Sequence, residues 1–135
     1  MVRDGDTRGV WDGDRLGRVA SNLIGNALHH GRRGEPVVVE LDGQRADGVA
    51  LRVKNRGEIP PELLEQVWEP FYSGRSHAAR GAGLGLGLYI VREIVRAHGG
   101  RADVHSGGDL TVFEIWLPRR AQGDAGSISS SPSLR

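Results

Sequence analysis

The sequence predicts an α+β fold, a two-layer α/β sandwich with helices on one face of a sheet. Two segments place apolar residues at helical spacing, and four shorter apolar segments are typical of strands. Along the chain the order is helix, two strands, short helix, loop, helix and two strands. A length of 135 residues fits a single domain of this kind.

The two long helices have recognisable ends. The first begins near Asp12 to Asp14, because either aspartate can act as the N-cap. It ends at Gly31 and Gly34, since glycine readily adopts the conformations that terminate a helix. The second helix spans 86–98 and stops at Gly99.

The remaining elements are shorter. A β-like piece is expected before the first helix, two strands after it, and a hairpin at the end of the domain. Two consecutive prolines favour the start of a short helix, because proline suits the first turn. The expected ranges are 9–11 for the β-like piece, 36–41, 49–53, 101–106 and 110–117 for strands, 60–68 for the short helix and 72–83 for a loop.

Composition excludes several classes of protein. With 38% hydrophobic residues, 26% charged residues and a net charge of +1, the chain is typical of a soluble globular protein, without a bias toward nucleic acid or an anionic membrane. It has no cysteine, no apolar leader and no apolar run long enough to span a membrane. We expect a domain at 1–120 followed by a disordered tail at 121–135, where serine and glycine dominate.

Asn22 and Asn26 are the first candidates for function. They are four residues apart, so they share a face of the first helix, away from its apolar face. Asparagine is a poor helix former, and an amide oxygen is a hard, neutral ligand that suits Mg²⁺. His29 and His30 follow on nearly the same side. The alternative is a pair of asparagines bonded only to water or nearby backbone.

A polar turn at 53–60 is the second candidate, because Asn55 at its edge can present a hydrogen-bonding side chain to a pocket. Asn-x-Gly is also common in ordinary turns, which is the alternative. The third candidate is the segment 81–88, which alternates glycine with apolar residues at the start of the second helix. Such glycines let backbone amides converge on an anion at a helix N-terminus, although a flexible hinge would share the pattern.

These motifs occur in a characteristic order. They are Asn22-Leu23-Ile24-Gly25-Asn26-Ala27, Asn55-x-Gly57 with Ile59-Pro60, Trp68-Glu69-Pro70-Phe71, Gly83-Leu84-Gly85-Leu86-Gly87-Leu88 and His98-Gly99-Gly100. Over residues 9–118 the chain resembles the catalytic ATP-binding domain of bacterial sensor histidine kinases, in its bacteriophytochrome-like subtype. This family belongs to the GHKL group, which includes gyrase and a heat-shock chaperone. The resemblance implies a Bergerat-type ATP-binding fold with helices on one face of a mixed sheet.

The resemblance implies ATP and Mg²⁺ as cofactors. Asn26 matches the asparagine that holds Mg²⁺ through its amide oxygen, and Asn22 matches the polar residue one turn earlier, near the phosphates. Hydrolysing relatives carry a glutamate base at that turn, so asparagine favours phosphoryl transfer. His29 falls at a phosphate-contacting position, so the resemblance implies a catalytic role for it. His30, beside it, is implied to belong to the nucleotide site.

Further nucleotide contacts are implied by the glycine boxes and the lid. Asn55 matches the residue that receives the adenine amino group, and Thr111 lies behind the adenine. The other matched positions are Gly57, Ile59, Phe71, Arg75, Arg80, Gly83, Leu84, Gly85, Leu86, Gly87 and Leu88.

The chain departs from the family pattern at three places. The first glycine box is one residue short after Gly57, and Leu110 stands where a glycine often precedes the threonine. Asparagine replaces aspartate at position 55, which removes charge assistance from the bond to adenine. On this basis, Asn55→Asp is expected to tighten ATP binding.

The implied activity is a histidine kinase that acts in the cytoplasm. None of its five histidines has the sequence context of a phosphoacceptor, and about a dozen residues precede the first helix. We therefore expect the acceptor histidine on a separate dimerisation module, a response regulator downstream, and a monomeric domain. Two alternatives remain open: a stand-alone serine kinase of the anti-sigma-factor type, and a degenerate nucleotide-binding module without catalysis.

Overall fold

The computed structural model describes residues 2–5, 9, 11–70 and 86–120, and their strands form one five-stranded sheet. The sheet order is β1-β2-β3-β5-β4, with β1 parallel to β2 and every other pair antiparallel. The strands are β1 (Val2–Gly5), β2 (Val38–Gly43), β3 (Gly48–Arg56), β4 (Arg101–Gly107) and β5 (Leu110–Pro118). The expected mixed sheet is therefore confirmed.

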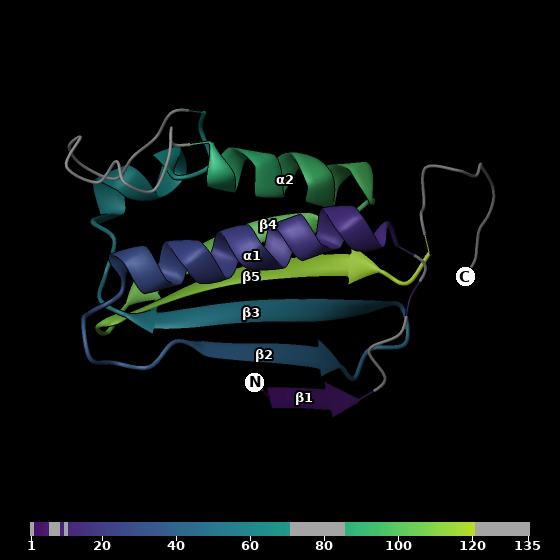
Figure 1. The fold of residues 1–135 in the computed structure, drawn as a ribbon, viewed down its shortest axis with the longest axis horizontal. Coiled ribbons are helices and arrows are strands. Elements are labelled where there is room, and N and C mark those ends of the chain that lie inside the picture. The colour runs from purple at the N-terminus through teal and green to yellow at the C-terminus, as the bar shows by residue number, and fades with distance from the viewer. Residues whose placement is uncertain (1, 6–8, 10, 71–85, 121–135) are drawn as a thin grey trace.

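Two long helices cover one face of this sheet, as Figure 1 shows. They are α1 (Gly13–His30) and α2 (Gly87–Ala97), and a 3₁₀ helix, η1 (Pro61–Gln66), follows β3. Asp12 is the N-cap of α1, where its side chain accepts a hydrogen bond from the backbone N of Arg15 at 3.1 Å. Gly31 ends the helix by donating its N–H to the carbonyl of Ala27 at 2.8 Å. The two-layer α/β sandwich is confirmed.

The core lies between the helices and the inner face of the sheet. Its buried side chains come from α1, α2, β3 and β5 and from the segment after η1. Trp68 and Phe113 meet there edge to face, with ring centroids 5.6 Å apart. Each fully buried aliphatic or aromatic side chain contributes about 1.5–3 kcal/mol. The central members are Val19, Leu23, Ala27, Val53, Val91, Val95, Phe113 and Ile115.

The outer face of the sheet is covered by paired charges instead of helices. Arg52 at the middle of β3 bonds Glu114 on one side at 2.7 Å and Asp42 on the other at 3.2 Å. Lys54 bonds Glu40 at 3.0 Å. Because opposite charges face each other across the strands, this side remains stable in water.

The N-terminal region differs from the expectation. A strand forms at 2–5, where none was predicted, and Gly9 and Trp11 are not in a strand, whereas Val10 lies outside the described residues. Pairing with the edge of β2 is what makes the short segment 2–5 a strand. Trp11 instead donates its indole N–H to the carbonyl of Pro118 at 2.7 Å.

Two other differences concern the middle and the end of the chain. The short helix is a 3₁₀ helix that ends at Gln66, two residues before the expected end. The predicted tail at 121–135 and the predicted loop at 72–83 lie outside the described residues. In the part of the chain that the structure describes, no helix is long and apolar enough to cross a membrane.

His98 joins the end of α2 to the start of α1. Its Nδ1 lies 2.9 Å from the carbonyl of Ile94, and its Nε2 accepts the backbone N–H of Asp12 at 3.2 Å. These partners assign the ring proton to Nδ1, because a carbonyl accepts and an N–H donates. The ring therefore connects the two helices.

Candidate functional site

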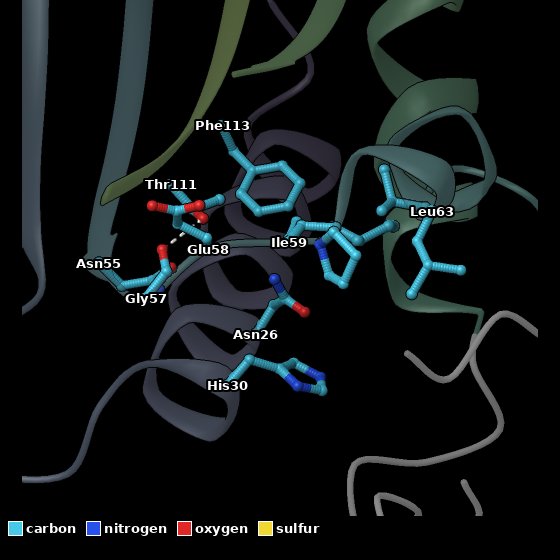
Figure 2. A pocket seen from close by; sticks show the side chains of 12 residues that line it. Asn26, His30, Asn55, Gly57, Glu58, Ile59, Leu63, Thr111 and Phe113 are labelled. Carbon is cyan, nitrogen blue, oxygen red and sulfur yellow. Dashed lines mark hydrogen bonds between the residues drawn. The ribbon is translucent and has the colours of Figure 1, made fainter. Parts of the chain in front are cut away.

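A cavity of about 200 Å³ opens at the end of the sheet where β3 ends and β5 begins. Its lining comes from α1, the end of β3 and the turn after it, η1 and the residue that follows it, the start of α2, and β5, and Figure 2 shows the side chains. The residues that line it are Asn26, His30, Asn55, Gly57, Glu58, Ile59, Pro60, Leu63, Val67, Leu88, Thr111 and Phe113. Three motif regions far apart in the sequence, the Asn22–Ala27 box, the 55–60 turn and the start of α2, therefore meet at one cavity.

Strand register explains why the cavity has a polar end. Asn55 pairs with Thr111, which pairs with Ser106, so the three side chains form one row across the sheet. The next row toward the core is apolar and contains Val53 and Phe113. The inner face of the sheet thus changes from apolar to polar where the cavity begins.

Asn55 is almost fully buried, with 6% of its surface exposed. Its Nδ2 donates a hydrogen bond to the carbonyl of Arg56 at 3.0 Å. No described residue donates to its Oδ1, so this oxygen is left to accept a bond from a ligand in the cavity. The adenine amino group is a donor of this kind, and the role of Asn55 in binding it stays a prediction.

This arrangement argues against the expectation that Asn55→Asp tightens ATP binding. An aspartate would place a carboxylate oxygen, in place of the amide N–H, beside the carbonyl of Arg56. Two acceptors would then face each other without a proton between them. The hydrogen bond to Arg56 therefore favours asparagine at this position. We expect the aspartate variant to bind ATP more weakly.

Thr111 belongs to a hydrogen-bonded network behind the 57–59 turn. Its hydroxyl donates to the carbonyl of Gly57 at 2.8 Å and lies 2.9 Å from the hydroxyl of Ser106. Because the proton of Thr111 goes to Gly57, Ser106 donates in the contact between the two hydroxyls, and its oxygen accepts the backbone N–H of Ile59 at 2.8 Å. Sequence reasoning missed Ser106. The signal that could have found it is the alternation of β4, in which Ala102, Val104 and Ser106 face the same side.

Asn26 and Asn22 differ in their surroundings. Asn26 lines the cavity, and in Figure 2 its amide points toward the segment that carries Ile59. Asn22 is not among the lining residues. Its Nδ2 donates to the carbonyl of Gly87 at 3.2 Å, so it ties α1 to the first residue of α2.

His29 and His30 are in contact with each other. Their rings are perpendicular, with centroids 4.7 Å apart. His30 lines the cavity, whereas His29 is exposed and is not among the lining residues. The structure thus brings only one of the two histidines to the site.

The glycine boxes are partly described. Gly57 has a φ of +113°, which a side chain would strain, and Ile59 and Leu88 line the cavity. Leu86 is the N-cap of α2 and Gly87 its first residue. The other predicted contacts lie outside the described residues: Phe71, Arg75, Arg80, Gly83, Leu84 and Gly85.

The chemistry of the cavity suits a nucleotide. Its apolar walls, with Leu63, Val67 and Leu88, fit the faces of a purine ring, and Asn55 provides an acceptor at the polar end. Among the described residues, no cluster of three or more His, Asp or Glu side chains could hold a metal ion. Asn26 provides an amide oxygen at the cavity, which is a ligand type that fits Mg²⁺, because this ion usually binds few protein groups together with substrate phosphates.

A model of the histidine kinase-, DNA gyrase B- and HSP90-like ATPases matches residues 11–121. The chain belongs to this family. Its resemblance to the catalytic domain of sensor histidine kinases, inferred from the order of the motifs, is confirmed. The comparisons support an ATP-binding kinase domain.

The relatives of this domain are longer proteins. The bacteriophytochrome of Pseudomonas aeruginosa is 42% identical over 128 residues, which are 93% of this chain and 17% of that protein. Sensor protein VanSC of Enterococcus gallinarum is 37% identical over 112 residues, 82% of this chain and 30% of that protein. The chain therefore spans less than a third of each.

Solved structures share the fold. The catalytic domain of histidine kinase ThkA, in a nucleotide-free form, superposes with a TM-score of 0.74 at 27% identity and covers 88% of this chain and 79% of that one. The mycobacterial sensor histidine kinase MprB gives a TM-score of 0.68 at 29% identity, covering 90% of this chain and 84% of that chain.

Proposed function

We propose that the domain binds Mg²⁺-ATP in this cavity and donates the γ-phosphate to a histidine on a separate dimerisation module. The observation that carries the proposal is the meeting of Asn26, Asn55 and Leu88 at one cavity, each from a different motif. The base would lie between the apolar walls, with its amino group at Asn55. The triphosphate would extend toward Asn26 and the N-terminus of α2, which favours anions.

Asn26 would hold Mg²⁺ through its amide oxygen. The bound ion neutralises charge on the phosphates and orients them for transfer. His30 lies one helical turn beyond Asn26 at the same cavity and would contact the phosphates. Phe71, Arg75, Arg80 and the glycines of the second box remain proposed contacts of the lid.

The cavity favours transfer over hydrolysis. Among its described lining residues Glu58 is the one carboxylate, and it already accepts the backbone N–H of Asp109 at 2.6 Å. An asparagine, Asn22, stands one turn before Asn26, and an amide cannot take a proton from water. Catalysis would then rest on positioning and charge neutralisation.

The proposed partners follow from the relatives, which are sensor proteins. A dimerisation and phosphoacceptor module would present the histidine, and a response regulator would accept the phosphoryl group from it. We place this exchange in the cytoplasm, where ATP is abundant, and propose a monomeric isolated domain.

Replacing Asn26 by alanine tests the nucleotide site. Asn26→Ala should abolish Mg²⁺-dependent ATP binding in titration calorimetry, because it removes the metal ligand, while the domain stays folded. Ser21→Ala, an exposed polar-to-alanine change on the same helix, should bind like the wild type. Unchanged affinity in folded Asn26→Ala would refute the metal-binding role.

A phosphotransfer assay tests the reaction. The domain is incubated with radiolabelled ATP and the dimerisation module of a sensor kinase, and the label on that module is then treated with acid. Phosphohistidine is acid-labile, so loss of the label supports the proposal. An acid-stable label would instead indicate a serine kinase, and ATP binding without any transfer would indicate a non-catalytic module.

A further inference from the structure

We propose that Arg32 and Asp109 position Asn55 so that its oxygen faces the nucleotide base, which makes the pair a determinant of the preference for a 6-amino purine. The pair is called the Arg32–Asp109 clip below. The inference rests on the proposed nucleotide site and adds two residues that lie outside its motifs. Neither lines the cavity.

Arg32 reaches Asn55 through a shared carbonyl group. The backbone N–H of Arg32 donates to the carbonyl of Arg56 at 3.1 Å, and Nδ2 of Asn55 donates to the same oxygen at 3.0 Å. That carbonyl therefore decides which end of the Asn55 amide points away from the cavity. An interaction that keeps Arg32 beside Arg56 therefore also keeps the side-chain amide of Asn55 in this orientation.

Asp109 holds the other side of the same turn. It sits in the hairpin between β4 and β5 with a φ of +67°. Its backbone N–H donates to the carboxylate of Glu58 at 2.6 Å, and its carbonyl accepts the N–H of Gly57 at 3.0 Å. The turn that follows Asn55 is thus bonded to the hairpin as well as to Arg32.

The clip joins these two sets of contacts, because the side chains of Arg32 and Asp109 bond each other. Nη1 of Arg32 donates to Oδ2 of Asp109 at 2.7 Å, and Nη2 donates to Oδ1. Two parallel bonds fix the angle between the guanidinium and the carboxylate, which a single bond would not. The hydrogen bonds from Arg32 also lower the pKa of the Asp109 carboxyl from its ordinary value. The carboxylate is therefore charged at neutral pH.

The orientation matters because the two ends of an amide have opposite hydrogen-bonding properties. With Nδ2 on Arg56, Asn55 presents an acceptor, which suits the 6-amino group of adenine. A rotated amide would present a donor, which suits the 6-oxo group of hypoxanthine or guanine. If the carbonyl of Arg56 were held less firmly, both orientations of the Asn55 amide would occur. The site would then discriminate less between 6-amino and 6-oxo purines.

The size of the effect is limited by exposure. The two side chains are 50% and 46% exposed, and exposed ion pairs are weak, although bidentate geometry places this one at the stronger end. We expect Arg32→Gln to weaken ATP binding by about five-fold. Binding of inosine triphosphate, whose 6-oxo group gains nothing from the fixed acceptor, should change little.

The experiment measures the dissociation constants of ATP and inosine triphosphate, both with Mg²⁺, by titration calorimetry. The variants are Arg32→Gln, Arg32→Lys and Arg45→Gln. Arg45 forms a similar exposed pair with Asp47 at 3.1 Å, in the β2–β3 turn at the far end of the sheet (Figure 1), so Arg45→Gln is a matched control. Thermal unfolding of each variant verifies that it is folded.

The inference predicts that the preference for ATP falls in Arg32→Gln, is partly restored in Arg32→Lys and is unchanged in Arg45→Gln. If Arg32 had a purely structural role, Arg32→Gln would weaken the binding of both nucleotides equally, and that result would overturn the inference. An unchanged preference for ATP over inosine triphosphate in Arg32→Gln would also overturn it. If Arg32→Gln does not fold, the same result in Arg32→Lys would overturn it. If the wild type binds ATP, these failures leave the proposed function intact, whereas a wild type that binds neither nucleotide refutes both proposals.

Discussion

Single side chains in this protein act through the direction of their hydrogen bonds. Asn55 shows this most clearly, because its NH₂ group is bonded to Arg56 and its oxygen is left for a ligand. Ser106 and Thr111 form a chain in which each hydroxyl donates once, toward Gly57. At this scale the identity of a residue matters less than which of its atoms already has a partner.

Asn55→Asp should therefore weaken ATP binding by about tenfold or more. The substitution removes one buried hydrogen bond and places a charged acceptor against a carbonyl group, and such a loss costs about 1–3 kcal/mol. Calorimetric titration with Mg²⁺-ATP measures the change. Gln44→Glu makes the same amide-to-carboxylate change at an exposed turn and should have no effect. Tighter binding by Asn55→Asp would show that charge assistance to the base outweighs the local repulsion.

Helices α1 and α2 are tied to each other near both ends of α2. Asn22 bonds the carbonyl of Gly87 at its start, and His98 at its C-cap accepts the N–H of Asp12. Packing of buried valine and isoleucine side chains fills the space between these ties. The N-terminus of α2, which is the proposed phosphate end of the cavity, is therefore positioned by a side chain from α1.

Asn22→Ala should loosen the first turn of α2 specifically. The lost hydrogen bond contributes about 1 kcal/mol, while alanine improves the helix propensity of α1 by about 0.5 kcal/mol. Global stability should thus change little, but hydrogen exchange should become faster at the amide of Ile90, which bonds the carbonyl of Leu86 at 2.9 Å. Ser21→Ala serves as the control. Equal protection of Ile90 in both variants would contradict the proposed tie.

Considered as a whole, the molecule has one apolar and one charged side of its sheet. Three aspartates, at turns and on the outer face, are stabilised as carboxylates. The pKa of Asp42, of Asp47 and of Asp109 is lowered from the ordinary value of 3.8. The main cause is a hydrogen bond, which comes in turn from the backbone N–H of Gln44 and the side chains of Arg45 and Arg32.

These shifts predict a loss of stability in acid. A carboxyl group whose pKa is lower in the folded state stabilises that state above its unfolded pKa. This stabilisation is lost as the pH falls through the folded pKa, so the effect belongs below about pH 4. Urea unfolding at a series of pH values should show it. The triple variant Asp42→Asn, Asp47→Asn, Asp109→Asn should lose less stability over that range, and an equal loss would contradict the assignment.

The sequence was informative wherever structure depends on neighbours in the chain. The boundaries of α1 follow from Asp12 and Gly31, and the strands follow from dense apolar segments. Strand 2–5 could not be found in this way, because it forms only by pairing with β2. Ser106 was missed for a related reason, since its role depends on a register that aligns it with Thr111.

The sequence by itself determined the fold class, the family and the order of the motifs, because periodicity, caps and glycine spacing are local properties. Only the tertiary structure decided which end of the Asn55 amide faces the cavity, that Asn22 bonds α2, and that Arg32 meets Asp109 across 77 positions of the chain. Hydrogen-bond direction depends on partners that folding brings together from distant segments. A pattern of residue types along the chain does not contain that information.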